Sequence, residues 1–342
     1  MKVLVYSTRS YDKEFLEAAN QNKYELHFTE AQLEESMAVL ASGYLAVCCF
    51  VDDVLDSKVL RQLSNVGIWL VLLRATGFNN VDLQAAEELG MIIMRVSRYS
   101  LDAVAEFAVA MMLDLDRKIH RAYTRVREGN FLLHGLIGFE LHGKTVGIIG
   151  TGKIGSVLAR ILLQGFDCSI LAYDAAENPE CTRLGVHYVP LKELLNKADI
   201  ISLHLPLTPE THYLINSDNL SQMKPGAMLI NTSRGALVDT HALIKALEKG
   251  QVGSVGLDVY EEESHVFFQD LSDEIIPDDM ITRLLTFPNV LITGHQAFFT
   301  REALLIIAET TIKNISDFAA GRENENVLKS RNMINTPGKD AH

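Results

Sequence analysis

The sequence contains few cysteines and no long apolar run. Its four cysteines are Cys48, Cys49, Cys168 and Cys181, and they form neither a CxxC pair nor a Cys/His spacing typical of zinc. We expect reduced thiols that act as small hydrophobic side chains, as in cytoplasmic proteins. No apolar run approaches the roughly 18 residues that span a bilayer, and the start, Met-Lys-Val-Leu-Val-Tyr, is too short and strand-like for a signal peptide. These absences predict a cytoplasmic protein without a metal site or a membrane anchor.

Positive charge is also scarce. The chain has 31 Lys and Arg against 44 Asp and Glu, a net charge of -13, which argues against nonspecific binding to nucleic acid or to an anionic membrane surface. One small anion bound through one local arginine remains compatible with this charge. The 342 residues, 48% apolar and 22% charged, are typical of a soluble globular protein with room for two ordinary domains.

Alternating strands and helices predict a first α/β unit that ends near Ser97. Helical stretches such as Asp82–Leu89, which Gly90 ends, separate most of the strands. This alternation predicts a parallel sheet that is covered on both faces. The expected strands are Lys2–Ser7, Glu25–Thr29, Leu45–Phe50, Ile68–Arg74 and Met91–Val96.

A long helical pattern, from about Leu101 to Glu128, follows after Ser100 as a candidate N-cap. Its apolar stripe consists of Val104, Phe107, Ala108, Met111, Met112 and Leu115. We expect a helix of this length to pack at the domain boundary or at a subunit interface, and hence a homodimer or homotetramer.

A second α/β unit begins at Lys144. Six strands are expected, which is the count of two mononucleotide-binding halves. The last strong helix, Arg301–Ala320, follows Thr300 as a candidate N-cap and is expected to return to the first unit, whereas the polar tail from about Asn324 predicts loose order. The six strands are Val146–Gly150, Ser169–Asp174, Ile200–Leu205, Ala227–Thr232, Val252–Val259 and Val290–Gly294.

The most informative motif lies near the middle of the chain. A buried strand runs into Gly150-x-Gly152-x-x-Gly155, and an apolar helical run follows. These glycines allow a tight turn, close approach to a pyrophosphate and close strand–helix packing. Asp174 ends the next strand, where a carboxylate accepts bonds from a ribose hydroxyl and repels a 2′-phosphate, so the motif predicts NAD rather than NADP. A glycine turn without a ligand is the alternative. With two units, the chain is expected to have two domains with a cleft between them.

Three kinds of reactive side chain follow expected strands of this second unit. Arg234 comes after one strand, the run Glu261–Glu263 after the next, and His295 after the last, while His204 also stands near a strand end. An arginine binds a carboxylate with two parallel hydrogen bonds. An ordinary loop arginine, a solvated acidic run and a core histidine are the alternatives. Taken together, the set provides the anion clamp, the proton donor and the tuning carboxylate that hydride transfer to a 2-keto acid requires.

The chain resembles the D-2-hydroxyacid dehydrogenase family, and within it the fermentative D-lactate dehydrogenases. The resemblance covers nearly the whole chain up to about Val327. It implies two doubly wound parallel-sheet domains: a discontinuous, flavodoxin-like catalytic domain of residues 1–99 plus 299–342, and a Rossmann NAD domain of residues 100–298. Leu205 stands where the family often has cysteine. The matching stretches are Arg74–Asp82, Ala103–Phe107, Gly150–Gly155, Asn231–Ala236, Gly256–Glu261 and Thr293–Phe298.

The resemblance also implies roles for individual residues. Arg234 is the substrate arginine, Glu263 the catalytic glutamate and His295 the acid/base. Glu263 is chosen by its spacing from Asp258, which leaves a one-residue error open. The implied cofactor contacts are Gly150, Thr151, Gly152, Lys153, Ile154, Gly155, Asp174, Leu205, Pro206, Thr211, Thr232, Ser233 and Asp258. The implied substrate contacts are the backbone amides of Ala75, Thr76 and Gly77 and the side chains of Tyr99, Arg234, His295 and Phe298.

The implied reaction is the reversible NADH-dependent reduction of pyruvate to D-lactate. His295 gives a proton to the developing alkoxide, and Arg234 holds the substrate carboxylate. One alternative is a dehydrogenase for a longer D-2-hydroxy acid, of the 2-hydroxyisocaproate type. Another is a non-catalytic NAD(H)-sensing protein that binds a partner, because corepressors of that type occur in the fold family.

Overall fold

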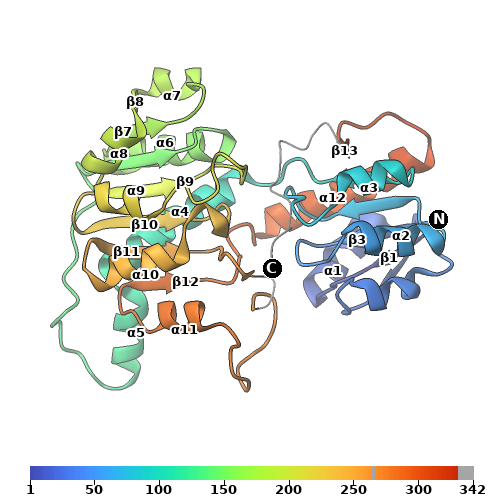
Figure 1. The fold of residues 1–342 in the computed structure, drawn as a ribbon, viewed down its shortest axis with the longest axis horizontal. Coiled ribbons are helices and arrows are strands. Elements are labelled where there is room, and N and C mark those ends of the chain that lie inside the picture. Colours follow the sequence, from blue (N-terminus) through green and yellow to red (C-terminus); the bar gives the residue numbers. More distant parts are fainter. Residues whose placement is uncertain (264–265, 330–342) are drawn as a thin grey trace. The chain divides into compact units, whose positions relative to one another are not determined.

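The computed structural model of the protein describes residues 1–263 and 266–329. The chain forms two compact units, the first from residues 1–100 with the described residues from Phe299 onward and the second from residues 101–298. Each unit has its own sheet, built mainly from parallel strands (Figure 1). Two α/β units of this kind confirm the predicted fold class.

The first unit has the strand order β13-β5-β4-β3-β1-β2. All neighbouring pairs are parallel except β13, which is antiparallel to β5. The order of the first five strands in the chain, 2-1-3-4-5, is that of flavodoxin-like sheets. The elements are β1 (Lys2–Val5), α1 (Ser10–Asn20), β2 (Glu25–Phe28), the 3₁₀ helix η1 (Glu35–Ala41), β3 (Ala46–Cys49), α2 (Ser57–Asn65), β4 (Leu70–Leu73), α3 (Leu83–Glu88), β5 (Ile92–Arg95), α12 (Arg301–Ala319) and β13 (Val327–Leu328).

Strand β3 shows why these strands could be predicted from the sequence. All four of its residues are buried, because helices cover both faces of the sheet. Val47 and Cys49 pack in the core under η1, α2 and α3, while Ala46 and Cys48 pack in the core under α1 and α12. All four cysteines of the chain are buried and free, which confirms the expected structural thiols.

The described residues from Phe299 onward belong to the first unit. The Thr300 side chain caps α12 by accepting from the amide of Ala303 at 3.2 Å, and Asn314 Nδ2 donates to the carbonyl of Arg95 at 3.0 Å. The expected loose order from Asn324 is wrong for residues 324–329, because β13 pairs with β5. Two residues are too short a run for a sequence pattern to indicate a strand. The rest of the predicted tail, residues 330–342, lies outside the described residues.

The second unit has the strand order β12-β11-β10-β9-β6-β7-β8, and all of its strand pairs are parallel. When the strands are numbered in chain order from β6, strands β6 to β11 have the Rossmann order 3-2-1-4-5-6, and β12 is a further strand at the edge. The prediction of six strands was therefore one short, since it missed the two-residue strand β8. The elements are α4 (Leu101–Arg117), α5 (Ile119–Arg127), β6 (Thr145–Ile149), α6 (Lys153–Phe166), β7 (Ser169–Tyr173), α7 (Pro179–Leu184), β8 (His187–Tyr188), α8 (Leu191–Lys197), β9 (Ile200–Leu203), α9 (Ser217–Gln222), β10 (Ala227–Asn231), the 3₁₀ helix η2 (Gly235–Leu237), α10 (Thr240–Glu248), β11 (Val252–Leu257), α11 (Asp279–Leu285) and β12 (Val290–Ile292).

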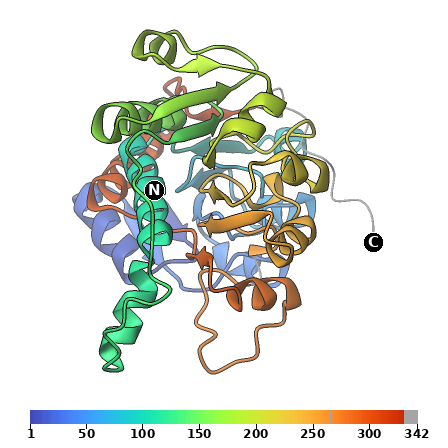
Figure 2. The same ribbon diagram turned by 90° about the vertical axis from the view of Figure 1, so that its left-hand side faces the viewer.

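The predicted single helix from Leu101 to Glu128 is wrong, because it is two helices. Lys118 between α4 and α5 adopts a left-handed conformation with φ 52°, and Asp114 Oδ1 accepts from the amide of His120 at 2.8 Å. Lysine carries no sequence signal for such a break. The predicted apolar stripe of α4 packs in the core of its own unit, whereas α5 has no buried residue and projects from the rest of the unit (Figures 1 and 2).

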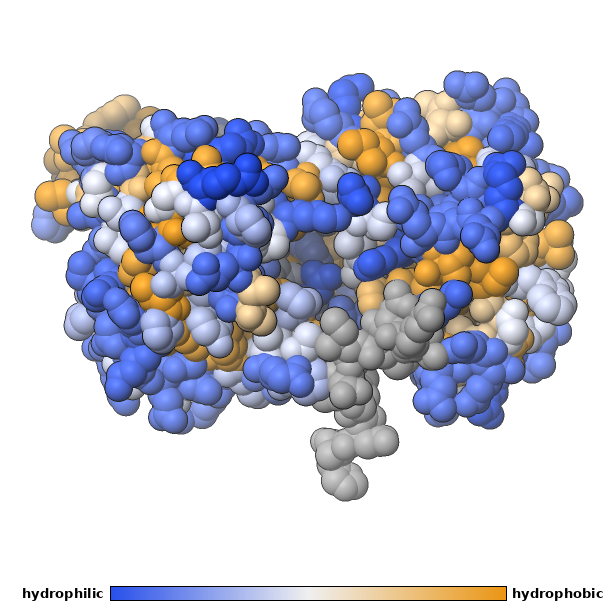
Figure 3. All heavy atoms as spheres, turned by 90° about the horizontal axis from the view of Figure 1, so that it is seen from above, coloured by the Kyte–Doolittle hydropathy of each residue, from blue (hydrophilic) through white to orange (hydrophobic). Residues whose placement is uncertain are grey.

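The surface of the protein carries both hydrophilic and apolar side chains. On the face drawn in Figure 3, hydrophilic side chains predominate and apolar ones gather in small groups, as is usual for globular proteins. In residues 1–263 and 266–329, no helix has the length and apolar character needed to cross a membrane.

Candidate active site

The glycine loop follows β6 at the point where the strand order reverses, between β6 and β9. Gly150 has φ +95°, and a Cβ there would lie 2.5 Å from the carbonyl oxygen of His204. A Cβ at Gly155 would overlap the carbonyl oxygen of Gly150, whereas one at Gly152 would meet no atom within 4 Å. Gly150 and Gly155 therefore permit the turn, and Gly152 leaves open space at the N-terminus of α6. Such a terminus is suited to a pyrophosphate.

Asp174 comes directly after β7 and is hydrogen-bonded to the glycine loop. Its Oδ2 accepts from the amide of Thr151 at 2.6 Å and from the Thr151 hydroxyl at 3.0 Å. The Tyr188 hydroxyl donates to Thr151 Oγ1 at 2.8 Å, so the unpredicted strand β8 helps to hold this loop. The carboxylate thus lies where the sequence predicted a ribose-binding acid.

The other expected cofactor residues lie on loops after β9 and β10. Thr211 Oγ1 donates to the carbonyl of Pro206 at 2.7 Å, and Ser233 Oγ donates to the carbonyl of Leu203 at 2.6 Å, which ties the two loops together. Thr232 Oγ1 is buried and has no hydrogen-bond partner within the part of the chain that the structure describes. An unsatisfied polar atom at the carboxyl end of β10, the strand next to β9, fits a site that a polar ligand completes.

His295 and Glu263 form a hydrogen-bonded pair, although 32 residues separate them. His295 Nδ1 lies 3.1 Å from Glu263 Oε1, and Glu263 Oε2 accepts from the amide of Tyr260 at 3.1 Å. Burial raises the pKa of the Glu263 carboxyl, but the hydrogen bond and charge of His295, the Tyr260 amide and the charge of Arg234 together outweigh burial and set that pKa below its ordinary value. The carboxylate form of Glu263 is therefore the favoured neighbour of the imidazole.

Of the three consecutive glutamates, Glu263 is the one that contacts His295. Glu261 is used elsewhere, because its Oε1 accepts from the Tyr213 hydroxyl and its Oε2 accepts from the Thr240 hydroxyl at 2.9 Å. The geometry thus favours the residue chosen by spacing.

Asp258 holds the loop that carries His295. The side chain is fully buried, and it accepts from the Thr293 hydroxyl at 2.6 Å and from the amides of Gln296 at 2.9 Å and Ala297 at 2.8 Å. Burial raises the pKa of Asp258 despite these bonds. His295 itself has φ 54°, a conformation that a residue other than glycine keeps only when its surroundings enforce it. Sequence reasoning missed this supporting contact, because it joins residues 35 or more positions apart.

Arg234 follows β10 in a half-buried position. Its Nη1 donates to the carbonyl of Ser233 at 2.6 Å, and its own carbonyl accepts from Asn231 Nδ2 at 2.8 Å. The next residue must be glycine, because a Cβ at Gly235 would overlap the backbone of Tyr260. This close approach places the Arg234 loop against the segment that leads to Glu263. Only the tertiary structure reveals that requirement.

The expected substrate residues are divided between the two units. Arg234, His295 and Phe298 belong to the second unit, whereas Ala75, Thr76, Gly77 and Tyr99 belong to the first. Within the first unit, the segment after β4 is held by Arg95, whose Nη1 donates to the carbonyl of Thr76 at 2.8 Å.

His204, the other histidine near a strand end, lies apart from the Glu263 pair. Burial lowers the pKa of His204 to about 4, and its Nε2 lies 2.8 Å from Ser202 Oγ. A histidine in this environment is neutral near pH 7 and is a poor proton donor. In the described ranges, no group of three or more His, Cys, Asp or Glu side chains is arranged to hold a metal ion.

Comparison with known proteins places this arrangement in a family. The family described as "D-isomer specific 2-hydroxyacid dehydrogenase, NAD binding domain" matches residues 109–297. The chain is 49% identical over 329 residues to D-lactate dehydrogenase of Escherichia coli K12. The aligned region covers 96% of this chain and 100% of that protein.

Two solved structures extend the likeness. The structure that identifies the pyruvate reductase of Chlamydomonas reinhardtii superimposes with a TM-score of 0.90 at 45% identity and covers 95% of this chain and 98% of that chain. D-lactate dehydrogenase with NAD⁺ from Lactobacillus jensenii superimposes with a TM-score of 0.80 at 33% identity and covers 96% of this chain and 100% of that chain. The chain therefore belongs to the D-isomer specific 2-hydroxyacid dehydrogenase family, and it is an NAD-dependent D-2-hydroxyacid dehydrogenase.

Proposed function

We propose that this enzyme reduces pyruvate to D-lactate with NADH and that Arg234, Glu263 and His295 are its catalytic residues. The observation that carries the proposal is the pair between His295 Nδ1 and Glu263 Oε1 at 3.1 Å, on the loops that follow β12 and β11. Arg234, on the loop that follows β10, contributes to the electrostatics of the same carboxylate. An acid, its carboxylate partner and an anion-binding guanidinium thus follow three adjacent strands.

His295 acts as the proton donor in reduction. When bound, NADH supplies the hydride to the keto carbon. Because Nδ1 faces Glu263, Nε2 is the nitrogen that gives its proton to the developing alkoxide, and solvent then restores it. Glu263 orients the ring through its hydrogen bond to Nδ1. In the reverse direction, neutral His295 removes the hydroxyl proton. Acid–base catalysis of this kind contributes typically about 10²–10⁴ in rate.

Arg234 binds the substrate carboxylate through two parallel hydrogen bonds and stabilises negative charge on the reacting oxygen. The first unit contributes the backbone amides of Ala75, Thr76 and Gly77 to that carboxylate, and Tyr99 and Phe298 contact the methyl group. In this proposal residues 1–99 with 299–342 form the catalytic domain, and residues 100–298 form the NAD domain. The cofactor contacts are those after β6, β7, β9, β10 and β11: Gly150, Thr151, Gly152, Lys153, Ile154, Gly155, Asp174, Leu205, Pro206, Thr211, Thr232, Ser233 and Asp258.

The substrate proposal is tested by initial rates of NADH oxidation with pyruvate, 2-ketobutyrate, 2-ketoisocaproate and phenylpyruvate, with NADPH as the cofactor control. We expect the highest kcat/KM with pyruvate and a product that is D-lactate by chiral chromatography. Discrimination of a single methylene is worth only about 1–3 kcal/mol, so 2-ketobutyrate is expected to react more slowly rather than not at all. A preference for 2-ketoisocaproate would identify the longer acid as the substrate. L-lactate as the product would contradict the proposed D stereochemistry.

The role of His295 is tested separately. The variant His295→Gln is expected to lose most turnover while NADH binding, followed by its fluorescence, stays close to that of the wild type. His204→Gln is the matched control, because His204 is hydrogen-bonded to Ser202 and not to Glu263. Wild-type turnover in His295→Gln would place the acid elsewhere.

We also propose that a second copy of the chain covers α5 and the loop that follows it. This segment leaves several large apolar side chains exposed, among them Phe131 (74%), Leu133 (82%) and Ile137 (86%). Several large apolar side chains exposed within one short segment are typical of an interaction surface. Sedimentation of the wild type is expected to show a dimer or a tetramer, and Leu133→Asp is expected to weaken it. A monomeric wild type would reject the proposal.

A further inference from the structure

Arg95 is the last residue of β5 and lies beside the segment that follows β4. In the register of these two parallel strands, Arg95 is opposite Leu73. The pairing continues beyond both strands, because the amide of Val96 donates to the carbonyl of Ala75 at 3.2 Å. Since the carboxyl ends of parallel strands share one edge of a sheet, Arg95 lies at the same edge as residues 75–78.

The guanidinium of Arg95 contacts two residues of this segment. Its Nη1 donates to the carbonyl of Thr76 at 2.8 Å, and its Cζ lies 5.0 Å from the centroid of the Phe78 ring, as in a cation–π contact. The main chain of Arg95 is also held, because its amide donates to the carbonyl of Asn326 at 3.0 Å and its carbonyl accepts from Asn314 Nδ2 at 3.0 Å. The guanidinium is therefore fixed against the segment that follows β4.

The positive charge of Arg95 has no counter-ion in the part of the chain that the structure describes. The side chain is half-buried, and burial lowers the pKa of its guanidinium without a carboxylate to oppose the shift. Arg74 differs, because its Nε lies 3.3 Å from Asp12 Oδ1. An arginine stays protonated in proteins, so a half-buried arginine without a counter-ion is favourably placed to interact with an anionic ligand.

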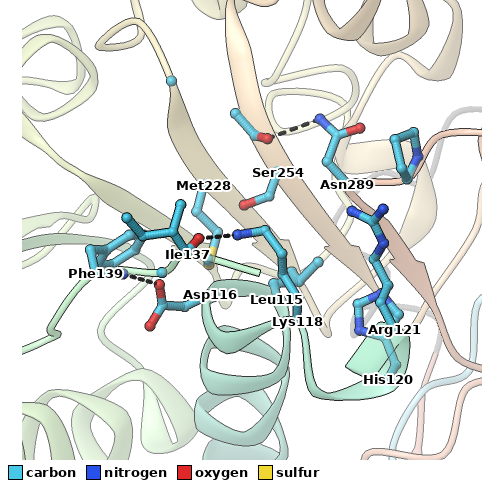
Figure 4. Close-up of a pocket in the computed structure, with 14 residues that line it drawn as sticks. Leu115, Asp116, Lys118, His120, Arg121, Ile137, Phe139, Met228, Ser254 and Asn289 are labelled. Carbon is cyan, nitrogen blue, oxygen red and sulfur yellow. Dashed lines mark hydrogen bonds between the residues drawn. The ribbon is translucent and has the colours of Figure 1, made fainter. Parts of the chain in front are cut away.

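A second half-buried arginine has different surroundings. Arg121 of α5 lies in the wall of a cavity near the amino ends of β10, β11 and β12 (Figure 4). The carboxylate of Asp116 belongs to the same wall, and α5 is the helix that we propose a second copy of the chain covers. Arg95, in contrast, contacts the segment that the proposed function assigns to the substrate.

The hydrogen bond to Thr76 also acts on the amide of Gly77, because the Thr76 carbonyl and the Gly77 amide belong to one peptide group. A charged donor at the carbonyl oxygen draws electron density from the peptide nitrogen and makes its N–H group a stronger donor, since hydrogen bonds in a chain polarise one another. In the proposed function this amide donates to the substrate carboxylate. The chain of interactions therefore runs from the guanidinium through the peptide group to the carboxylate.

We propose that Arg95 is a positioning residue that supplies a second positive charge, besides that of Arg234, to the substrate carboxylate through the peptide group of Thr76 and Gly77. The role rests on the proposed function, in which that carboxylate binds the amides of residues 75–77. Because the carboxylate keeps these contacts in the ground state and in the transition state, the effect falls on substrate binding rather than on the chemical step.

The test compares Arg95→Gln, which keeps a neutral N–H donor, with Arg95→Lys, which keeps the charge. Oxamate, an unreactive analogue of pyruvate that retains the carboxylate, is titrated against the NADH complex by fluorescence. We expect Arg95→Gln to raise the Kd of oxamate and the KM for pyruvate about tenfold, with kcat within about twofold of the wild type. Arg95→Lys is expected to recover most of the loss. Methyl pyruvate, a neutral ester, is expected to react equally well with the wild type and with Arg95→Gln.

The matched control is Arg61→Gln. Arg61 is an exposed arginine of α2 in the same unit, so the change in charge is the same, and urea unfolding followed by Trp69 fluorescence verifies that each variant is folded. Unchanged oxamate binding in Arg95→Gln, or the same loss in Arg61→Gln, would overturn the proposal. It would also be overturned if Arg95→Lys lost as much as Arg95→Gln, or if methyl pyruvate were affected as strongly as pyruvate.

Failure of the proposed function is visible in the wild type and not in the Arg95 variants. A wild type that prefers 2-ketoisocaproate would contradict the proposed substrate. The same comparison is then made with that acid and its methyl ester, because every 2-keto acid carries the carboxylate on which Arg95 is proposed to act.

Discussion

An arginine follows a buried parallel strand in each of the two units, and the surroundings of the two arginines are opposite. Arg74 comes directly after β4 and is 2% exposed. Its guanidinium donates to the main-chain carbonyls of Tyr6, Ser7 and Cys48 at 3.2–3.3 Å, and its Nε lies 3.3 Å from Asp12 Oδ1. Arg234 follows β10 and is only half-buried, and its Nη1 donates to the carbonyl of Ser233 at 2.6 Å.

The carboxyl groups near the two arginines also differ, because their pKa values are shifted in opposite directions. Asp53, near Arg74, accepts from the Ser7 hydroxyl and from the amides of Leu33 and Phe50 at 2.6–2.7 Å, yet burial raises its pKa to about 6. Glu263, near Arg234, has a pKa below its ordinary value because His295 is its partner. A strand-end arginine thus becomes a structural cation when carbonyls surround it, and it becomes a ligand candidate when a titrating pair lies beside it.

The largest expected effect is on the stability of the first unit. Arg74→Met removes a buried cation from Asp12 and from three carbonyls, which costs about 3–5 kcal/mol of unfolding free energy. Urea unfolding followed by circular dichroism and by fluorescence of Trp69, the single tryptophan of the chain and a residue of this unit, measures it. Arg283→Met, an exposed arginine paired with Glu248, is the control, expected to cost at most about 1 kcal/mol. Equal stability of the two variants would contradict the prediction that the buried arginine contributes more to the unfolding free energy than the exposed one.

The next effect is on activity and belongs to the second unit. Arg234→Gln is expected to lower kcat/KM for pyruvate about 10²–10³-fold, as for loss of a donor aimed at developing charge, with an unchanged urea midpoint. Arg234→Lys is expected to restore only part of the loss, because an ammonium group lacks the two-pronged geometry. Wild-type kinetics in Arg234→Gln would show that this arginine is as structural as Arg74.

The two acids are expected to give opposite pH dependences. The pKa of Asp53 rises from 3.8 to about 6 on folding, so its contribution to stability is complete below about pH 4 and is lost as the pH rises through about 6. The difference corresponds to at most about 3 kcal/mol. Unfolding free energies of wild type and Asp53→Asn from pH 4 to 7 measure it, and parallel curves would contradict it. For Glu263 the sign is reversed, because its folded pKa is lowered and its contribution is lost as the pH falls.

The smallest expected effect tests the close packing behind Arg234. Gly235→Ala places a Cβ against the backbone of Tyr260, so the loop must shift, at a cost of about 1–3 kcal/mol in stability and about tenfold or more in kcat/KM. The control is Gly165→Ala in α6, where a Cβ meets nothing within 4 Å. That substitution is expected to be neutral or to stabilise by up to about 1 kcal/mol. Equal behaviour of the two alanine variants would remove the packing argument.

Most of the fold was predictable because both sheets are buried on both faces. Runs such as Ala46–Cys49 and Ala227–Asn231 are fully buried strands, and continuous apolar runs bounded by polar turns indicate such strands. Strands β8 and β13 were missed because two residues form no pattern, and the break at Lys118 was missed because its left-handed conformation depends on Asp114 and not on the lysine.

The candidate site was predictable as a set of positions and not as a set of contacts. The order of residues along strands indicates that Arg234, Glu263 and His295 follow adjacent strands, because carboxyl ends of parallel strands meet at one edge. That Glu263 rather than Glu261 reaches His295, and that Asp258 holds the histidine loop, depends on backbone directions that no local pattern records.

The sequence by itself determined the two α/β units, the glycine turn at residues 150–155 and the residue types available at each strand end, because these follow from local periodicity and from backbone freedom. Only the tertiary structure decided which arginine is buried and structural and which lies beside the histidine pair. The physical reason is that solvation and partners, which set the energy of a charge, come from residues far apart in the chain.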